Sequence, residues 1–192
     1  DFLTSMALVA RAVKAHRPQL VMGDGQGAMI ALGLSKPLVL EATLALRNVD
    51  VKEAIQIGRA WGQVKGIDLD WFAFADAWRG LYQPAMERVR TGEVDWVNLD
   101  GLHRMNLDQL LPDFSLVDLN ESELVHLNHM WHRLDPWPDS VLGMNRLKNN
   151  FTLAALSNGN VALIVNMAKR ARIPWDTILG AEIVGHYKPE PK

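Results

Sequence analysis

A turn of small polar residues is the part of this sequence with the clearest chemical potential. Ser157 and Asn158 follow the apolar run Phe151–Leu156, and Lys188 comes later in the segment Tyr187-Lys188-Pro189. A turn that leads from a strand into a helix presents hydroxyl, amide and backbone N–H donors to an anion. Together with the lysine, these residues predict a cationic pocket that is rich in hydrogen-bond donors.

The elements that position this pocket alternate between helix and strand. Apolar periodicity predicts a helix at Ser140–Asn149, a strand at Phe151–Leu156, a helix at Val161–Ala171 and a strand near Ala181–Val184. Such alternation is typical of a parallel α/β layer. We therefore expect the polar turn at one strand end and Lys188 at a second.

A run of helices precedes this layer. The sequence predicts helices at Val51–Lys65, from the N-cap Asp70 onward with a kink or restart at Pro84, at Asp100–Leu111, and at Glu121–Arg133. Asn120 and Glu123 have the spacing of a capping box in front of the last of these helices. Four helices in succession favour an all-helical insert.

The N-terminal segment has a different pattern. Residues 2–16 have helical spacing, Gln19–Met22 is predicted as a strand, and Gly23–Gly27 as a tight turn. Ala28–Leu34 is predicted as a helix or a buried apolar segment, which would complete a β-turn-α unit. For Leu38–Leu46 the pattern does not decide between strand and helix.

Composition excludes several classes of protein. The chain has 192 residues, of which 48% are hydrophobic and 22% charged, and its net charge of −2 provides no basic surface for nucleic acid. The longest apolar runs fall far short of the ~20 residues of a membrane-spanning helix. The absence of cysteine excludes disulfides and thiolate chemistry. We expect a cytoplasmic protein that binds neither membrane nor nucleic acid.

Four segments in a fixed order resemble a known family. Besides the polar turn and the Tyr-Lys-Pro segment, they are Phe74–Arg79 and Leu134–Asp139. In this combination, residues 50 to 190 resemble the 2-haloacid dehalogenase (type II) branch of the haloacid dehalogenase superfamily. The resemblance implies a doubly wound, Rossmann-like parallel α/β core with an inserted helical cap. It divides the chain into a non-matching segment at 1–48, a cap at 49–134 and a partial core at 135–192.

The resemblance also implies a reaction and a role for each site residue. In this family an aspartate attacks the carbon that bears the halogen, and water then cleaves the resulting ester. By resemblance, Lys188 would hold the attacking carboxylate, while Ser157 and Asn158 would bind a carboxylate. Arg79 would receive the substrate carboxylate or the departing halide, and its planar guanidinium suits either task. The resemblance implies no cofactor and no metal.

The attacking aspartate is missing from the sequence. The family's first motif, Asp-x-(Phe/Tyr)-Gly-Thr, does not occur, and the chain ends four residues after Lys188, before the last acidic motif. If Val49-Asp50 is taken as the tail of the first motif, Thr43 stands at the position of the aspartate. A threonine hydroxyl is a poor nucleophile without an adjacent base. The nearest acids, Asp24 and Glu41, do not lie in the motif. We expect a fold incomplete at both ends.

Two further patterns have simpler interpretations. The Gly23–Gly27 turn partly matches a dinucleotide fingerprint, a nucleophile elbow and an acidic phosphatase turn, but a glycine turn with positive φ explains it. His126, His129 and His132 recur every third residue, but on an α-helix they drift around the axis without a carboxylate partner. We interpret them as a polar helix face.

Trp61, Trp71 and Trp78 are predicted as core contacts, of which a minority could line a substrate pocket.

The sequence thus predicts a hydrolase of the 2-haloacid dehalogenase type that acts on a short 2-haloalkanoic acid. Without the nucleophile motif, the chain is expected to be inactive as written. The alternative is a non-catalytic binding or interaction protein on the same scaffold, in which exposed strand edges would favour association, for example as a homodimer.

Overall fold

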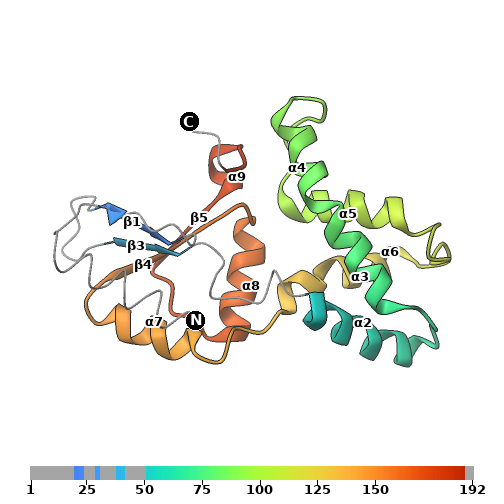
Figure 1. Cartoon of the computed structure of the whole chain (residues 1–192), viewed down its shortest axis with the longest axis horizontal. Helices are drawn as coiled ribbons and strands as arrows, with labels where there is room; N and C mark the ends of the chain where they lie inside the picture. The colour runs from blue at the N-terminus through green and yellow to red at the C-terminus, as the bar shows by residue number, and fades with distance from the viewer. Residues whose placement is uncertain (1–19, 24–28, 31–37, 42–50, 189–192) are drawn as a thin grey trace.

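The computed structural model describes residues 20–23, 29–30, 38–41 and 51–188. Figure 1 shows helices α2 to α6 gathered on one side of the molecule and the strands on the other, with α8 between them. In chain order the elements are β1 (Leu20–Gly23), β2 (Met29–Ile30), β3 (Leu38–Glu41), α2 (Val51–Lys65), α3 (Trp71–Gly80), α4 (Tyr82–Arg90), α5 (Leu99–Leu110), α6 (Glu121–Asn128), the 3-10 helix η1 (His129–Arg133), α7 (Ser140–Lys148), β4 (Thr152–Ser157), α8 (Val161–Ala171), β5 (Thr177–Gly180) and α9 (Ala181–Val184).

The strands form a mainly parallel sheet. Strands β3, β4 and β5 are neighbours and run parallel, with Glu41 opposite Ala155 and Ser157 opposite Gly180. Strand β1 also pairs parallel with β3, and β2 meets β3 in one antiparallel pair. Helix α7 packs on β4, and α8 on β5. The predicted α/β core of Rossmann type with a helical cap is confirmed.

Close approach of two helices organises the core of the helical part. The buried ring of Trp71 in α3 lies against two glycines of α2, Gly58 and Gly62. If these residues carried a Cβ atom, it would stand only 2.4 Å from the ring at Gly58 and 2.6 Å at Gly62, so the close approach depends on glycine at both positions. Phe74 and Trp78 continue the aromatic core along α3. Since α3 also bears Arg79, this packing fixes the helix that presents a candidate site residue.

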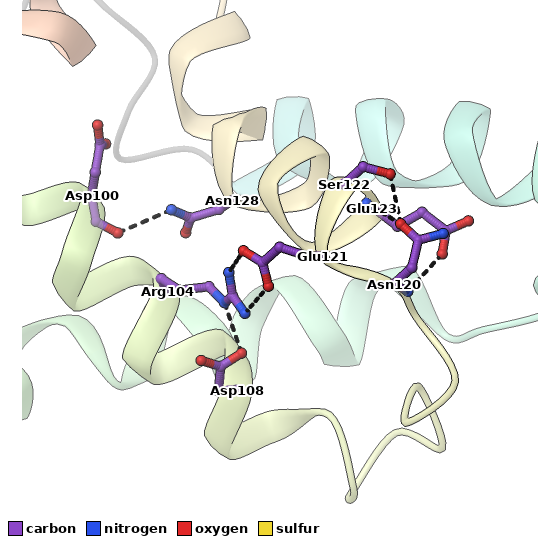
Figure 2. Close-up of polar contacts among 8 residues, drawn as sticks. All are labelled: Asp100, Arg104, Asp108, Asn120, Glu121, Ser122, Glu123 and Asn128. Carbon is purple, nitrogen blue, oxygen red and sulfur yellow. Dashed lines mark hydrogen bonds and ion pairs between the residues drawn. The ribbon is translucent and has the colours of Figure 1, made fainter.

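Helix α6 begins as the sequence predicts and is tied to α5. The Asn120 side chain accepts from the backbone N–H of Glu123, and the Glu123 carboxylate accepts from the backbone N–H of Asn120. Arg104 of α5 donates to Glu121 at 2.8 Å and to Asp108 at 2.8 Å, as Figure 2 shows. The capping box is therefore confirmed, and a guanidinium links the start of α6 to α5.

Three predicted elements differ from the structure. The helix expected at Glu121–Arg133 is α-helical only to Asn128 and continues as the 3-10 helix η1. The last strand lies at Thr177–Gly180, and Ala181–Val184 is a helical turn. Met29–Ile30 form a strand within the segment expected as a helix or buried apolar run. Short apolar runs fit either element, so periodicity alone could not distinguish them.

Several predictions fall outside the described residues. These are the helix at residues 2–16, most of the Gly23–Gly27 turn and Thr43. Within the described part of the chain, no helix has the length and apolar character needed to cross a membrane.

Candidate active site

The polar turn at the end of β4 is held by its own side chains. The buried Ser157 hydroxyl accepts a hydrogen bond from the backbone N–H of Gly159 at 3.0 Å. The Asn158 amide oxygen accepts from the backbone N–H of Lys188 at 2.7 Å, and its amide nitrogen lies 3.6 Å from the sulfur of Met86 in α4. Asn158 therefore connects the strand end, the C-terminal segment and the helical cap.

Lys188 reaches the same strand end by an unexpected route. It follows the short helix α9 and does not stand directly at the end of a second strand, as the sequence had suggested. Its ammonium donates to the main-chain oxygen of Leu156 at 3.1 Å, and its own main-chain oxygen accepts from Arg90 at 3.3 Å. The half-buried cation therefore lies at the carboxyl end of β4, next to Ser157.

Arg79 approaches from the helical part. Its helix, α3, begins at Asp70, whose carboxylate accepts from the backbone N–H groups of Phe72 and Ala73, both at 3.0 Å. The guanidinium carbon lies 4.5 Å from the centre of the Tyr82 ring, a cation–π contact that holds the charge near the start of α4.

The four residues predicted from the sequence line one cavity of about 110 Å³. Among the described residues, Arg79 and Lys188 are the cations on its wall, and Ser157 and Asn158 add polar groups. The rest of the lining is largely aromatic and aliphatic: Trp78, Tyr82, Leu99, Trp131, Leu134, Leu163, Ile164 and Met167, together with Gly159 and His103. The site is small, with two cations in an otherwise largely apolar wall.

Three cavity residues with aromatic rings were not identified from the sequence: Tyr82, His103 and Trp131. Burial lowers the pKa of His103 to about 3, with His132 and Arg79 acting in the same direction and Asp100 opposing them, so the imidazole is neutral near pH 7. Burial raises the pKa of the Tyr82 hydroxyl, although Arg79 and a hydrogen bond with Asn158 oppose that shift. No local motif marks these positions, because only helix packing brings them to the strand end.

A polar network lies next to the turn. Asp100 of α5 accepts from the Asn160 amide at 2.7 Å and is hydrogen bonded to Nε2 of His132 at 2.8 Å. Since Asn160 directly precedes α8, these contacts tie the helical part to the segment that follows Ser157. The network supports the position of the turn without lining the cavity.

The remaining candidates are dispersed. Glu41 ends β3, whose backbone is paired with the strand that ends at Ser157, while Asp24 lies outside the described residues. Trp78 lines the cavity, whereas Trp61 and Trp71 pack edge to face in the helical core.

Comparisons with known proteins connect this geometry to a family. Neither the comparison with protein-family models nor that with curated proteins gives a match. Among solved structures, an L-2-haloacid dehalogenase is 42% identical with a TM-score of 0.74, over 80% of this chain and 65% of that one. A defluorinating L-2-haloacid dehalogenase is 37% identical with a TM-score of 0.73, over 80% and 63%.

A more distant structure shares the fold. The L-2-haloacid dehalogenase of Xanthobacter autotrophicus is 19% identical with a TM-score of 0.65, over 80% of this chain and 60% of that one. The chain thus spans slightly less than two thirds of the length of each of these three enzymes. Over the matched part, this chain is similar in fold and sequence to L-2-haloacid dehalogenases.

Proposed function

We propose that the cavity is the substrate site of a 2-haloacid dehalogenase-type hydrolase and that its ligand is a short 2-haloalkanoic acid. The observation that carries this proposal is that Arg79, Asn158 and Lys188 line one small cavity at a strand end. The enzymes that are 42% and 37% identical are L-2-haloacid dehalogenases, which supports the same class of substrate.

Charge supports an anionic ligand. Arg79 and Lys188 place two cations on the wall of a largely apolar cavity. Their attraction for a carboxylate is stronger there than in water, because the surroundings screen it less. In the proposed roles, Arg79 binds the substrate carboxylate or the departing halide together with Asn158. In the family reaction Lys188 and Ser157 would hold the attacking carboxylate, and in this chain the charge of Lys188 attracts the bound acid.

Size and polarity limit the ligand further. A volume of about 110 Å³ is well below the ~300–1,000 Å³ of pockets for drug-sized molecules, so the ligand has only a few heavy atoms. Trp78, Trp131 and Leu163 offer apolar surface to a short alkyl group or a halogen. A two- or three-carbon haloacid combines both properties.

The reaction requires an attacking carboxylate. Its oxygen forms a bond to C2 as the carbon–halogen bond breaks, and the halide leaves with the bonding electrons. Water then adds to the acyl carbon of the ester, which releases the 2-hydroxy acid, a proton and the restored carboxylate. Because the family motif with its aspartate does not occur in residues 1–192, we propose that this chain binds the acid without turning it over.

Calorimetric titration with 2-chloropropionate tests the binding site. We expect saturable binding that weakens about 10- to 100-fold in Arg79→Gln, the range for loss of a hydrogen bond to a charged group. Arg88→Gln is a matched control, because Arg88 is an exposed α4 arginine paired with Glu93. Absence of binding, or equal weakening in both variants, would contradict the proposed substrate class.

Chloride release tests the second half of the proposal. We expect no release above the buffer rate, together with retained binding. Sustained release would show that an acid outside the family motif attacks the substrate. In that case Glu41 is the first acid to test, because the backbone of β3 pairs with the strand that ends at Ser157. Loss of chloride release in Glu41→Gln would identify Glu41 as the attacking acid, and unchanged release would exclude it. Binding without release also matches the alternative of a non-catalytic binding protein on this scaffold.

We also propose a cytoplasmic location and no nucleic-acid partner, on the basis of the absence of cysteine and the net charge of −2. Self-association as a homodimer is tested by sedimentation. Its candidate surface includes the exposed apolar side chains Val64 and Phe72 of α2 and α3, and a monomer at all concentrations would exclude it.

A further inference from the structure

We propose that Asp100, His129 and His132 bind a divalent transition-metal ion such as Zn²⁺. One carboxylate oxygen and one nitrogen from each imidazole lie within 4.8 Å of one another. Two imidazoles and a carboxylate are a common set of three protein ligands for zinc, with a fourth position left to solvent. None of the three residues lines the cavity described above, so this site is separate from the proposed haloacid site.

The 3-10 helix explains how the two histidines meet. In a 3-10 helix, side chains three residues apart eclipse one another, whereas in an α-helix they share a face but are offset around the axis. Because η1 begins at His129, the ring centres of His129 and His132 are only 4.5 Å apart. His126 belongs to α6 and is engaged elsewhere, stacked on Trp61 and hydrogen bonded to Arg133.

The carboxylate that the local sequence lacked comes from α5. Oδ1 of Asp100 lies 2.8 Å from Nε2 of His132. Ligand atoms about 2.0–2.1 Å from a tetrahedral zinc ion lie roughly 3.3 Å from each other, so these two atoms need to separate only slightly. The metal would replace the proton they share.

Outer hydrogen bonds already orient the two inner ligands. The Asn160 amide donates to the second oxygen of Asp100 at 2.7 Å, and Asn166 lies 2.9 Å from Nδ1 of His132. Metal sites depend on such outer contacts, which fix the ligand orientation and the histidine tautomer. In this structure the Asn166 amide nitrogen faces Nδ1. With a metal on Nε2, Nδ1 would carry the proton, and the Asn166 amide would turn over so that its oxygen accepts from Nδ1.

An ion can reach the site from the surface. His132 is buried, but His129 is exposed, and both line an open groove with His126 and Asn166. The groove also contains Arg133 and Arg170, which oppose a cation. Arg133 is hydrogen bonded to the main-chain oxygen of His126, and Arg170 is paired with Asp135. The carboxylate of Asp100 supplies the negative charge that offsets them.

Zinc titration of the chelator-treated full chain tests the proposal. We expect one saturable Zn²⁺ site per chain by calorimetry and a rise in the melting temperature, because an ion that binds only the folded state stabilises it. His129→Ala should weaken binding by about tenfold or more and abolish the rise. Its melting temperature without metal should match that of the parent chain, since His129 is exposed.

His126→Ala is the matched control, because it removes a neighbouring exposed histidine that is not one of the three ligands. It should keep the affinity and the melting shift of the parent chain. Equal losses in both variants would show adventitious binding to surface histidines and overturn the proposal, as would the absence of saturable binding. The readout uses the metal alone, so its outcome is independent of haloacid binding.

Discussion

The ammonium of Lys188 and the main-chain oxygen of Leu156 are joined by a hydrogen bond of 3.1 Å. This contact holds a cation from the C-terminal segment against the end of β4, beside the hydroxyl of Ser157. Helix α3 supplies the second cation, Arg79, from the helical part of the molecule. The positive charge of the cavity wall therefore depends on two segments far apart in the sequence.

Replacement of Lys188 by methionine should weaken the binding of 2-chloropropionate. The apolar stem is kept while the charge is lost, so affinity should fall about 10- to 100-fold with little change in stability. Lys169→Met, on the exposed side of α8, should leave affinity unchanged. Calorimetric titration of the three proteins measures the effect, and unchanged affinity in Lys188→Met would remove this residue from the binding site.

The buried His103 should make stability depend on pH. Its folded-state pKa of about 3 lies below its ordinary value of 6.5, so the unfolded chain takes up the proton first as pH falls. The stability contributed by the neutral imidazole is present above pH ~6.5 and is lost progressively as the pH falls toward ~3, by up to about 1.4 kcal/mol per pH unit.

His103→Phe keeps a ring but removes this titration. Between pH 7.5 and pH 5, the free energy of unfolding should fall in both proteins, but by less in the variant. The difference between the two falls should be up to about 2 kcal/mol. Urea unfolding at several pH values measures the difference. His126→Gln removes an exposed imidazole whose pKa is also lowered by partial burial, so its profile should depart from that of the parent chain by less than the profile of His103→Phe does. Identical profiles for all three proteins would contradict a buried neutral His103.

Gly180→Ala should disturb the turn after β4. A Cβ at this position would stand 2.7 Å from the main-chain oxygen of Gly159. This clash can be relieved only by a shift of the backbone, because the clashing atom is not the end of a flexible side chain. We expect a loss of about 1–3 kcal/mol in the free energy of unfolding, together with weaker haloacid binding. Gly80→Ala has no heavy atom within 4 Å of the new Cβ and should have little effect on either measurement.

Asp70→Ala should destabilise the helix that bears Arg79. Two backbone N–H groups at the start of α3 would lose their acceptor, at a cost of about 1 kcal/mol. Chemical denaturation measures this cost. Asp76→Ala, on the exposed side of the same helix, should change stability by less than about 0.5 kcal/mol, and equal effects would show that the cap is not the cause.

Local signals in the sequence determined much of this protein. Asp70 and Asn120 marked the starts of α3 and α6, because a capping side chain bonds backbone groups only two or three residues away. The strand that ends in Ser157 was readable from a short apolar run before a polar turn. The order of Arg79, Asn158 and Lys188 indicated the family before any contact between them was known.

Tertiary structure decided what depends on contacts between distant segments. Strand β5 lies at Thr177–Gly180 because Asp176 exchanges hydrogen bonds with Leu153, so a partner strand and not local hydrophobicity set its position. His103 and Tyr82 entered the cavity through the packing of α4 and α5, and Asp100 met the histidines of η1 across another helix contact. Sequence periodicity describes one element at a time, whereas a site at the junction of several elements follows from how their buried faces fit together.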